Sequence, residues 1–369
     1  MDAHQVDKAR RYSHLRYGLS LAETGMLLVF FFTVFMSGLS VQLCFFLQQL
    51  TASRSPFLIG PLLLALLNGI FAIVFFPLTF YHSFLLEHQF GLSTQSLKDW
   101  FLDQLKAGGI SLAISCFCLD IWYVAMRVAG SAWWIWMGCF WIIFTVVLTQ
   151  LAPVVIIPLF FKYSRCPSES LVARIRSLAG KMRVGLLDVF EINYSAKSLK
   201  ANAALVGWGS TRRVLLTDTL RQRYTDDEIE VILAHEFAHQ RFGHLTKHIV
   251  LQSGLIMIFF YAVSAAGQRA LAGGAQVPLS DPAAVPLVLS ALTVFGLISR
   301  PLGNWASRRW ERQADALALE ATGLRQAFIS MMEKLAEQNL SDRHPPPLIK
   351  LFFFDHPPVD ERIALARRK

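Results

Sequence analysis

The chain has 369 residues, of which 54% are hydrophobic and only 17% are charged, and its formal net charge at pH 7 is +9. This composition excludes an ordinary water-soluble protein and indicates a membrane protein. The positive charge does not indicate a nucleic-acid partner, because the lysines and arginines do not gather in one patch interleaved with aromatic residues.

Long apolar runs predict the membrane-spanning helices. A helix needs about 20 residues to cross a bilayer, and most of the runs reach that length. The last two runs are shorter and contain Gln252 and Pro286, so we expect them to be tilted or partly buried in protein. The six predicted spans are 26–50, 57–80, 107–126, 132–161, 249–266 and 284–298.

Basic residues alternate between the loops. Four precede the first span, two lysines lie between the second and third spans, and a basic block at 162–247 follows the fourth span, whereas each of the alternate loops contains a single arginine. By the positive-inside rule, the N-terminus, the second loop, the segment 162–247 and the C-terminal region are predicted to face the cytoplasm. No internal targeting signal is visible, which favours a prokaryotic plasma membrane.

The polar segments carry their own patterns. Helical periodicity occupies 169–182, a strand pattern occupies 187–192, and 202–218 predicts two strands around a glycine turn. After the last span, helices are predicted at 304–322, 325–338 and 358–368.

The short segment "AHEFAH", residues 234–239, has two histidines four positions apart and a glutamate directly after the first. Upstream, Thr225 and Glu228 form a capping-box pattern, which predicts a helix here. On a helix, His235 and His239 share one face and could bind one metal ion, with Glu236 facing the ion's water. The alternative is a surface helix that carries these solvated side chains by coincidence.

A catalytic zinc ion needs a third protein ligand. A nearby third histidine does not fit the H-E-x-x-H-x-x-G-x-x-H pattern, because Gly243 comes one position late and His244 one position early. The later "ERQAD" offers Glu311 and Asp315 one helical turn apart. Glu311 would bind zinc and Asp315 would brace a ligand histidine, although "ERQAD" alone could be an ordinary solvated helix face.

Five stretches, in order, carry a wider resemblance: "FLLEHQFGLSTQSLKDWFLDQLK", "NAALVGWGSTRRVLLTDTL", "VILAHEFAHQRFGH", "SRRWERQADALAL" and "HPPVDERI". With them the chain resembles the integral-membrane CAAX prenyl endopeptidases, or a-factor-converting enzymes, of the gluzincin metallopeptidases. The resemblance implies helices around a large intramembrane chamber, and together with the six apolar runs it predicts a predominantly α, polytopic membrane protein of about six transmembrane helices. It also implies a gluzincin-like zinc protease domain with a small β-sheet. Family members commonly carry seven spans, one more than we predict here.

The resemblance also implies the site. It implies one Zn²⁺ per chain on three ligands: His235, His239 and Glu311. Glu236 would then be the catalytic base, Asn202 would lie on a strand that binds extended substrate, and His356 of "HPP" would approach the zinc. From the residues alone, Asn202 could be a turn residue and His356 a loop histidine.

These patterns divide the chain into four parts. We expect 1–161 to hold four membrane helices, 162–247 the first part of the protease domain, 248–300 a membrane hairpin, and 301–369 the second part with the third zinc ligand.

The function expected from the resemblance is peptide-bond hydrolysis, with removal of the C-terminal tripeptide after a prenylated cysteine. The expected partners are a peptide or protein substrate, including prenylated ones, and the lipid bilayer. Three alternatives are a heat-shock-type membrane quality-control metalloprotease, a site-2-type intramembrane protease, and a non-enzymatic lipid or peptide chamber protein. The four spans before "AHEFAH" oppose the first, its charged flanks oppose the second, and Glu236 opposes the third.

Overall fold

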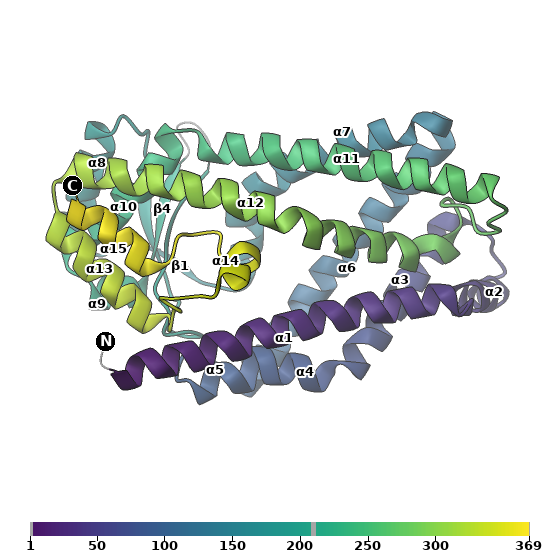
Figure 1. Ribbon diagram of the computed structural model, residues 1–369, viewed down its shortest axis with the longest axis horizontal. Helices are drawn as coiled ribbons and strands as arrows, with labels where there is room; N and C mark the ends of the chain where they lie inside the picture. The colour runs from purple at the N-terminus through teal and green to yellow at the C-terminus, as the bar shows by residue number, and fades with distance from the viewer. Residues whose placement is uncertain (1–2, 208–211, 369) are drawn as a thin grey trace.

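The computed structural model describes residues 3–207 and 212–368. Figure 1 shows long helices side by side along the molecule, with a small sheet at the end that also holds both chain termini. The glycine turn predicted within 202–218 falls partly outside the described residues. The membrane helices and the sheet therefore form two parts of an elongated molecule.

The helices of the membrane part come close to the predicted number of about six crossings. Five described segments are long and apolar enough to cross a membrane, and one of these, Leu97–Leu159, contains two helices that pack on each other. The six crossing helices are α1 (Ala3–Met36), α3 (Pro56–Val74), α6 (Leu97–Ala129), α7 (Trp133–Leu151), α11 (His244–Ala272) and α12 (Val285–Thr322). Shorter helices in this part are α2 (Leu39–Thr51), α4 (Phe76–Phe80) and α5 (Leu86–Gln89).

The first span differs from the predicted one. The apolar run 26–50 is not one helix, because α1 ends at Met36 and α2 begins at Leu39 after a turn. Gly38 in this turn has φ +73°, a left-handed conformation that favours glycine. Hydropathy alone does not detect such a break, since the residues on both sides are equally apolar.

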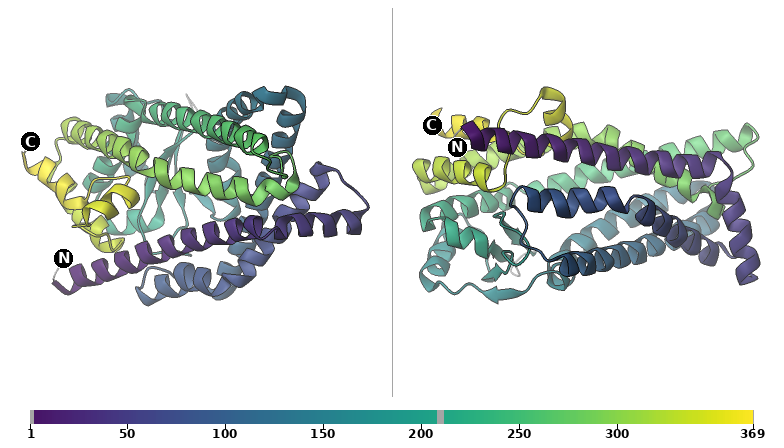
Figure 2. Two further views of the ribbon diagram at one scale, coloured as in Figure 1. Left: turned by 45° about the vertical axis from the view of Figure 1, so that its right-hand side comes forward. Right: turned by 90° about the horizontal axis from the view of Figure 1, so that it is seen from below.

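The last span is longer than predicted. The run 284–298 and the helix predicted at 304–322 are one continuous helix, α12. The predicted domain boundary at residue 300 therefore falls inside α12. The division of the chain into four parts stays a prediction. Helix α12 thus runs without a break from the membrane part to "ERQAD". Helix α1 packs along α12 (Figure 2).

The sheet has the strand order β1-β2-β4-β3. Strand β2 pairs parallel with β4, and the outer pairs β1–β2 and β4–β3 are antiparallel, so β3 is an edge strand. The strands are β1 (Tyr163–Arg165), β2 (Asp188–Ile192), β3 (Ala203–Val206) and β4 (Arg213–Thr217). The sequence predicted β2, β3 and β4, but not the three-residue β1.

Helices surround the sheet. They are α8 (Glu169–Lys181), α9 (Asp218–Arg223), α10 (Asp226–Arg241), α13 (Arg325–Gln338), α14 (Pro347–Phe353) and α15 (Val359–Arg368). The sequence predicted four of these, and α9 and α14 were missed because each has only six or seven residues.

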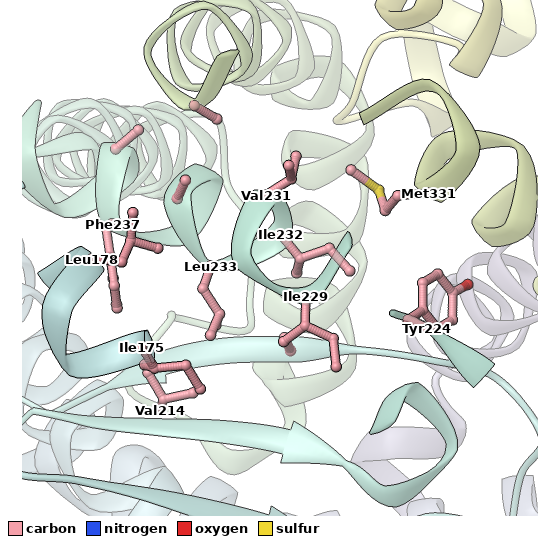
Figure 3. Close-up of a cluster of buried hydrophobic side chains, with 14 of the residues drawn as sticks. Ile175, Leu178, Val214, Tyr224, Ile229, Val231, Ile232, Leu233, Phe237 and Met331 are labelled. Carbon is pink, nitrogen blue, oxygen red and sulfur yellow. The ribbon is translucent and has the colours of Figure 1, made fainter. Parts of the chain in front are cut away.

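Helix α10 is the centre of the packing. It contacts α8, α12, α13 and β3, and Figure 3 shows its apolar side chains between the strand that carries Val214 and the neighbouring helices. Leu233 and Phe237 of α10 are fully buried in this core. Burial of each such side chain is worth about 1.5–3 kcal/mol, so the core fixes the position of the helix that carries "AHEFAH".

Partly buried polar contacts join the two parts of the molecule. Glu87 of "EHQFG" accepts a hydrogen bond from the Tyr12 hydroxyl at 2.5 Å and pairs with Lys200 Nζ at 2.8 Å. Nearby, Lys197 Nζ lies 2.5 Å from Asp103 Oδ2. Residues of α1, α5 and α6 are thus tied to the loop that leads into β3, which holds the sheet against the membrane helices.

Candidate metal centre

The predicted capping box sets the start of α10. Thr225 Oγ1 accepts a hydrogen bond from the Glu228 backbone N–H, and Thr225 N–H donates to Glu228 Oε2 at 2.8 Å. Glu228 also accepts bonds from Ser330 and Lys334 of α13. Burial alone would raise the pKa of Glu228, but these bonds outweigh it and hold the pKa below its ordinary value. The carboxylate therefore locks α13 onto the first turn of α10.

Three predicted ligands meet where α10 crosses α12. His235 Nε2 lies 3.2 Å from Glu311 Oε2, and His239 Nε2 lies 3.1 Å from Glu311 Oε1. The two Nε2 atoms are 3.0 Å apart. Residues that are 76 positions apart in the sequence thus present one donor atom each, and these atoms lie within 4.8 Å of one another.

This donor set fits a metal ion. Two imidazole nitrogens and one carboxylate are a set of three that catalytic zinc sites use, with a further position left for water or substrate. His235 and Glu311 are buried, with 8% and 4% of their surface exposed. Glu311 Oε2 is buried without a hydrogen-bond partner among the described residues, and a cation would satisfy it.

Asp315 lies behind His235. Its Oδ1 is 2.9 Å from His235 Nδ1, and Arg362 of α15 binds both of its carboxylate oxygens at 2.6 and 2.8 Å. Burial alone would lower the pKa of His235, but the adjacent carboxylates of Asp315 and Glu311 outweigh burial and raise the pKa to about 9 in the metal-free protein. Asp315 is in the position that we expected of a brace, whereas sequence reasoning missed Arg362.

Glu236 is half-buried beside the two histidines. Burial raises the pKa of its carboxyl, and the nearby histidines partly offset this. A carboxylate whose pKa moves toward neutrality is suited to accept and return a proton.

His356 lies at the rim of the cluster, and half of its side chain is exposed. Its Nε2 is 3.5 Å from Glu311 Oε1, and its Nδ1 is 2.8 Å from Asp355 Oδ1. Arg308 of α12 holds this loop by donating to the carbonyl oxygens of Lys350 and Phe354. The structure therefore brings His356 to the cluster.

Asn202 is exposed, directly before the edge strand β3. Its carbonyl oxygen accepts a hydrogen bond from Thr217 N–H at 3.1 Å, and its Oδ1 accepts one from Ala203 N–H at 2.9 Å. Asn202 is thus part of the start of β3, rather than of an isolated turn, and among the described residues it makes no hydrogen bond to the cluster.

Two family comparisons cover almost the whole chain. The sequence model of peptidase family M48 matches residues 167–369, which is more than half of the chain. The chain belongs to peptidase family M48. Residues 1–162 match a second model, described as CAAX prenyl protease N-terminal, five membrane helices. This M48 protein is therefore a membrane-embedded metalloendopeptidase, and the family implies a metal at the cluster.

Relatives of this M48 peptidase occur in bacteria and eukaryotes. It is 26% identical over 377 residues to the uncharacterized metalloprotease YhfN of Bacillus subtilis, covering 100% of this chain and 87% of that protein. It is 27% identical over 325 residues to CAAX prenyl protease 1 of Saccharomyces cerevisiae, covering 82% of this chain and 70% of that protein.

A solved structure supports the fold. The crystal structure of S. mikatae Ste24p superposes with a TM-score of 0.87 at 24% identity, covering 99% of this chain and 89% of that one. The comparison confirms the predicted fold class, a polytopic helical membrane protein with a small sheet in its protease part.

Proposed function

We propose that this M48 peptidase is a zinc metalloendopeptidase that removes the C-terminal tripeptide of CAAX substrates. The observation that carries the proposal is the convergence of His235, His239 and Glu311 beside Glu236, in a chain whose first 162 residues match the CAAX prenyl protease N-terminal model. That N-terminal match favours a CAAX substrate over the heat-shock-type alternative. The similar protein from Saccharomyces cerevisiae is itself a CAAX prenyl protease.

The proposed chemistry assigns each residue a separate task. His235, His239 and Glu311 would hold one zinc ion, which when bound supplies a Lewis acid that polarises the scissile carbonyl. Glu236 would take a proton from the attacking water and return it to the leaving amine. Asp315, held by Arg362, would keep the Nδ1 proton of His235 in place and leave its Nε2 lone pair for the ion.

His356 would stabilise the charge that develops on the carbonyl oxygen. A protonated His356 would donate one N–H to Asp355 and have the other directed toward the cluster, from which its Nε2 is 3.5 Å away. Asp355 thereby fixes the orientation of the ring. Donors of this kind act mainly in the transition state.

The substrate would lie along β3. This strand is at the edge of the sheet and contacts α10, so an extended peptide that pairs with β3 would pass beside "AHEFAH". Asn202 would bind such a peptide at the start of the strand. On the side of His356 and Arg362, a cavity of about 730 Å³ is lined by residues of α1, among them Arg16 and Tyr17.

We also propose that the metal centre faces the cytoplasm of a prokaryotic cell, from the plasma membrane. The positive-inside pattern supports this orientation, and the sheet and both termini lie at one end of the molecule (Figure 1). A relative that aligns over the whole chain, YhfN of Bacillus subtilis, is bacterial.

The direct test is hydrolysis by the full-length protein purified in detergent. Matched CAAX peptides with and without a prenyl group would be incubated with the protein, with a chelator, and with chelator followed by zinc. We expect zinc-dependent release of the C-terminal tripeptide, identified by mass spectrometry. Zinc-dependent cleavage of unfolded proteins, with no release of tripeptide from either peptide, would instead favour the quality-control alternative.

A further inference from the structure

His239, the second histidine of the metal cluster, has His244 as its neighbour. His244 did not fit the H-E-x-x-H-x-x-G-x-x-H pattern of a third ligand. Helix α10 ends at Arg241 and α11 begins at His244, with Gly243 between them at φ +64°. Gly243 is left-handed in the turn between the two helices, a conformation that glycine adopts without strain. The ring of His244 therefore lies against the last turn of α10, with its centroid 5.0 Å from that of His239.

The two rings are linked through nitrogen atoms. His244 Nδ1 lies 3.1 Å from His239 Nδ1, and His244 Nε2 lies 3.2 Å from Gln313 Oε1 on α12. Gln313 is the central residue of "ERQAD", between the predicted ligand Glu311 and the brace Asp315. One short stretch of α12 thus supports His235 directly through Asp315 and His239 indirectly through His244.

The direction of these hydrogen bonds follows from Gln313, the last group in the series. The amide oxygen of Gln313 can only accept, so His244 must carry its proton on Nε2. A neutral imidazole then has its lone pair on Nδ1, which accepts a bond from the Nδ1–H of His239. His239 is left with a lone pair on Nε2, the atom that faces Glu311 Oε1 at 3.1 Å.

Packing fixes the ring of His244. The residue is only 3% exposed, and its ring stacks on Trp310 at 5.8 Å with an interplanar angle of 19° and on Phe242 at 5.4 Å with an angle of 24°. Stacking on Trp310 and Phe242 restricts rotation of the His244 ring about its side-chain bonds. The bond to His239 is therefore held in one geometry before any metal binds.

We propose that His244 and Gln313 are positioning residues that keep the proton of His239 on Nδ1 and its Nε2 lone pair directed at the metal. This inference rests on the proposed metal site. It gives the two ligand histidines different supports, a charged one for His235 from Asp315 and Arg362, and a neutral one for His239. Partners of this kind orient a ligand and commonly change metal affinity by about 10–100-fold when lost.

The test is zinc affinity of the full-length protein in detergent, measured by competition with a chelator, together with the melting temperature of the metal-free protein. His244→Phe keeps an aromatic ring between its neighbours and removes both nitrogens. We expect it to weaken zinc binding by about 10–100-fold while the metal-free melting temperature changes little. The control is His248→Phe, since His248 also contacts the Trp310 ring but lies on the exposed side of α11; its zinc affinity should equal that of wild type.

A second pair of variants keeps the test valid if His244→Phe does not fold. Gln313→Leu removes the acceptor and should weaken zinc binding in the same way, whereas Gln313→Glu preserves an acceptor and should retain it. Wild-type affinity in both His244→Phe and Gln313→Leu would overturn the inference. So would a loss of metal-free stability with unchanged affinity, since that result assigns His244 to packing alone. A wild-type protein that binds no zinc would instead refute the proposed metal site itself.

Discussion

Removal of Asp315 is the perturbation for which the structure gives the sharpest expectation. This carboxylate is fully buried, contacts His235 Nδ1 at 2.9 Å and is bound by Arg362 at both oxygens. Asp315→Leu leaves the Arg362 side chain, which is 12% exposed, without its nearest partner. Breaking a buried pair in this way costs on the order of 3–5 kcal/mol of stability. Loss of the acceptor should also weaken zinc binding about 10–100-fold, or about 1.4–2.7 kcal/mol.

The two effects separate in a double-variant series. Asp315→Leu, Arg362→Leu and the double variant would be compared by metal-free melting temperature and by zinc competition. The double variant removes both charges, so much of the lost stability should return. Its zinc affinity should stay weak, because His235 still has no acceptor for its Nδ1 proton. Recovery of zinc affinity along with stability, or wild-type affinity in Asp315→Leu alone, would refute the bracing role.

Three further predictions test other parts of the account. His356→Phe should keep zinc and substrate affinity while kcat falls about a hundredfold to a thousandfold; a raised KM at unchanged kcat would assign His356 to substrate binding. Glu228→Gln should lower the melting temperature at neutral pH, because the bonds from Lys334 and Ser330 favour the charged carboxylate. Since the folded pKa lies below 4.5, this stabilisation is complete above pH 4.5 and disappears as the pH falls through the folded pKa, so a pH-independent difference between the two proteins contradicts it. Gln222→Cys, on the exposed side of α9, should resist impermeant thiol reagents in intact cells, and labelling from outside would reverse the proposed topology.

The sequence predicted those features that depend on local patterns. Apolar runs located the crossing helices, because burial in a bilayer requires about 20 apolar residues in a row, although the bounds of the first and the last helix were wrong. The capping box of Thr225 and Glu228 gave the start of α10, because that motif acts within four residues. The spacing of His235 and His239 likewise predicted that their side chains share one face of the helix.

Features that depend on tertiary contacts could not be predicted in this way. Arg362 is separated from Asp315 by 47 positions, and only the packing of α15 against α12 brings the two together. His244 was considered only as a metal ligand in a fixed pattern, and the turn at Gly243 directs it to His239 instead. The continuity of α12 was also missed, because a change from apolar to charged residues suggests a boundary that a rigid helix can cross.

The most direct test of the central claim compares zinc content and peptide hydrolysis in two variants. In wild type we expect about one zinc ion per chain. Glu311→Ala should lose both zinc and activity, because it removes a ligand, whereas Glu236→Gln should retain zinc and lose activity, because it removes only the base. Full activity in Glu236→Gln, or full zinc content in Glu311→Ala, would contradict the account.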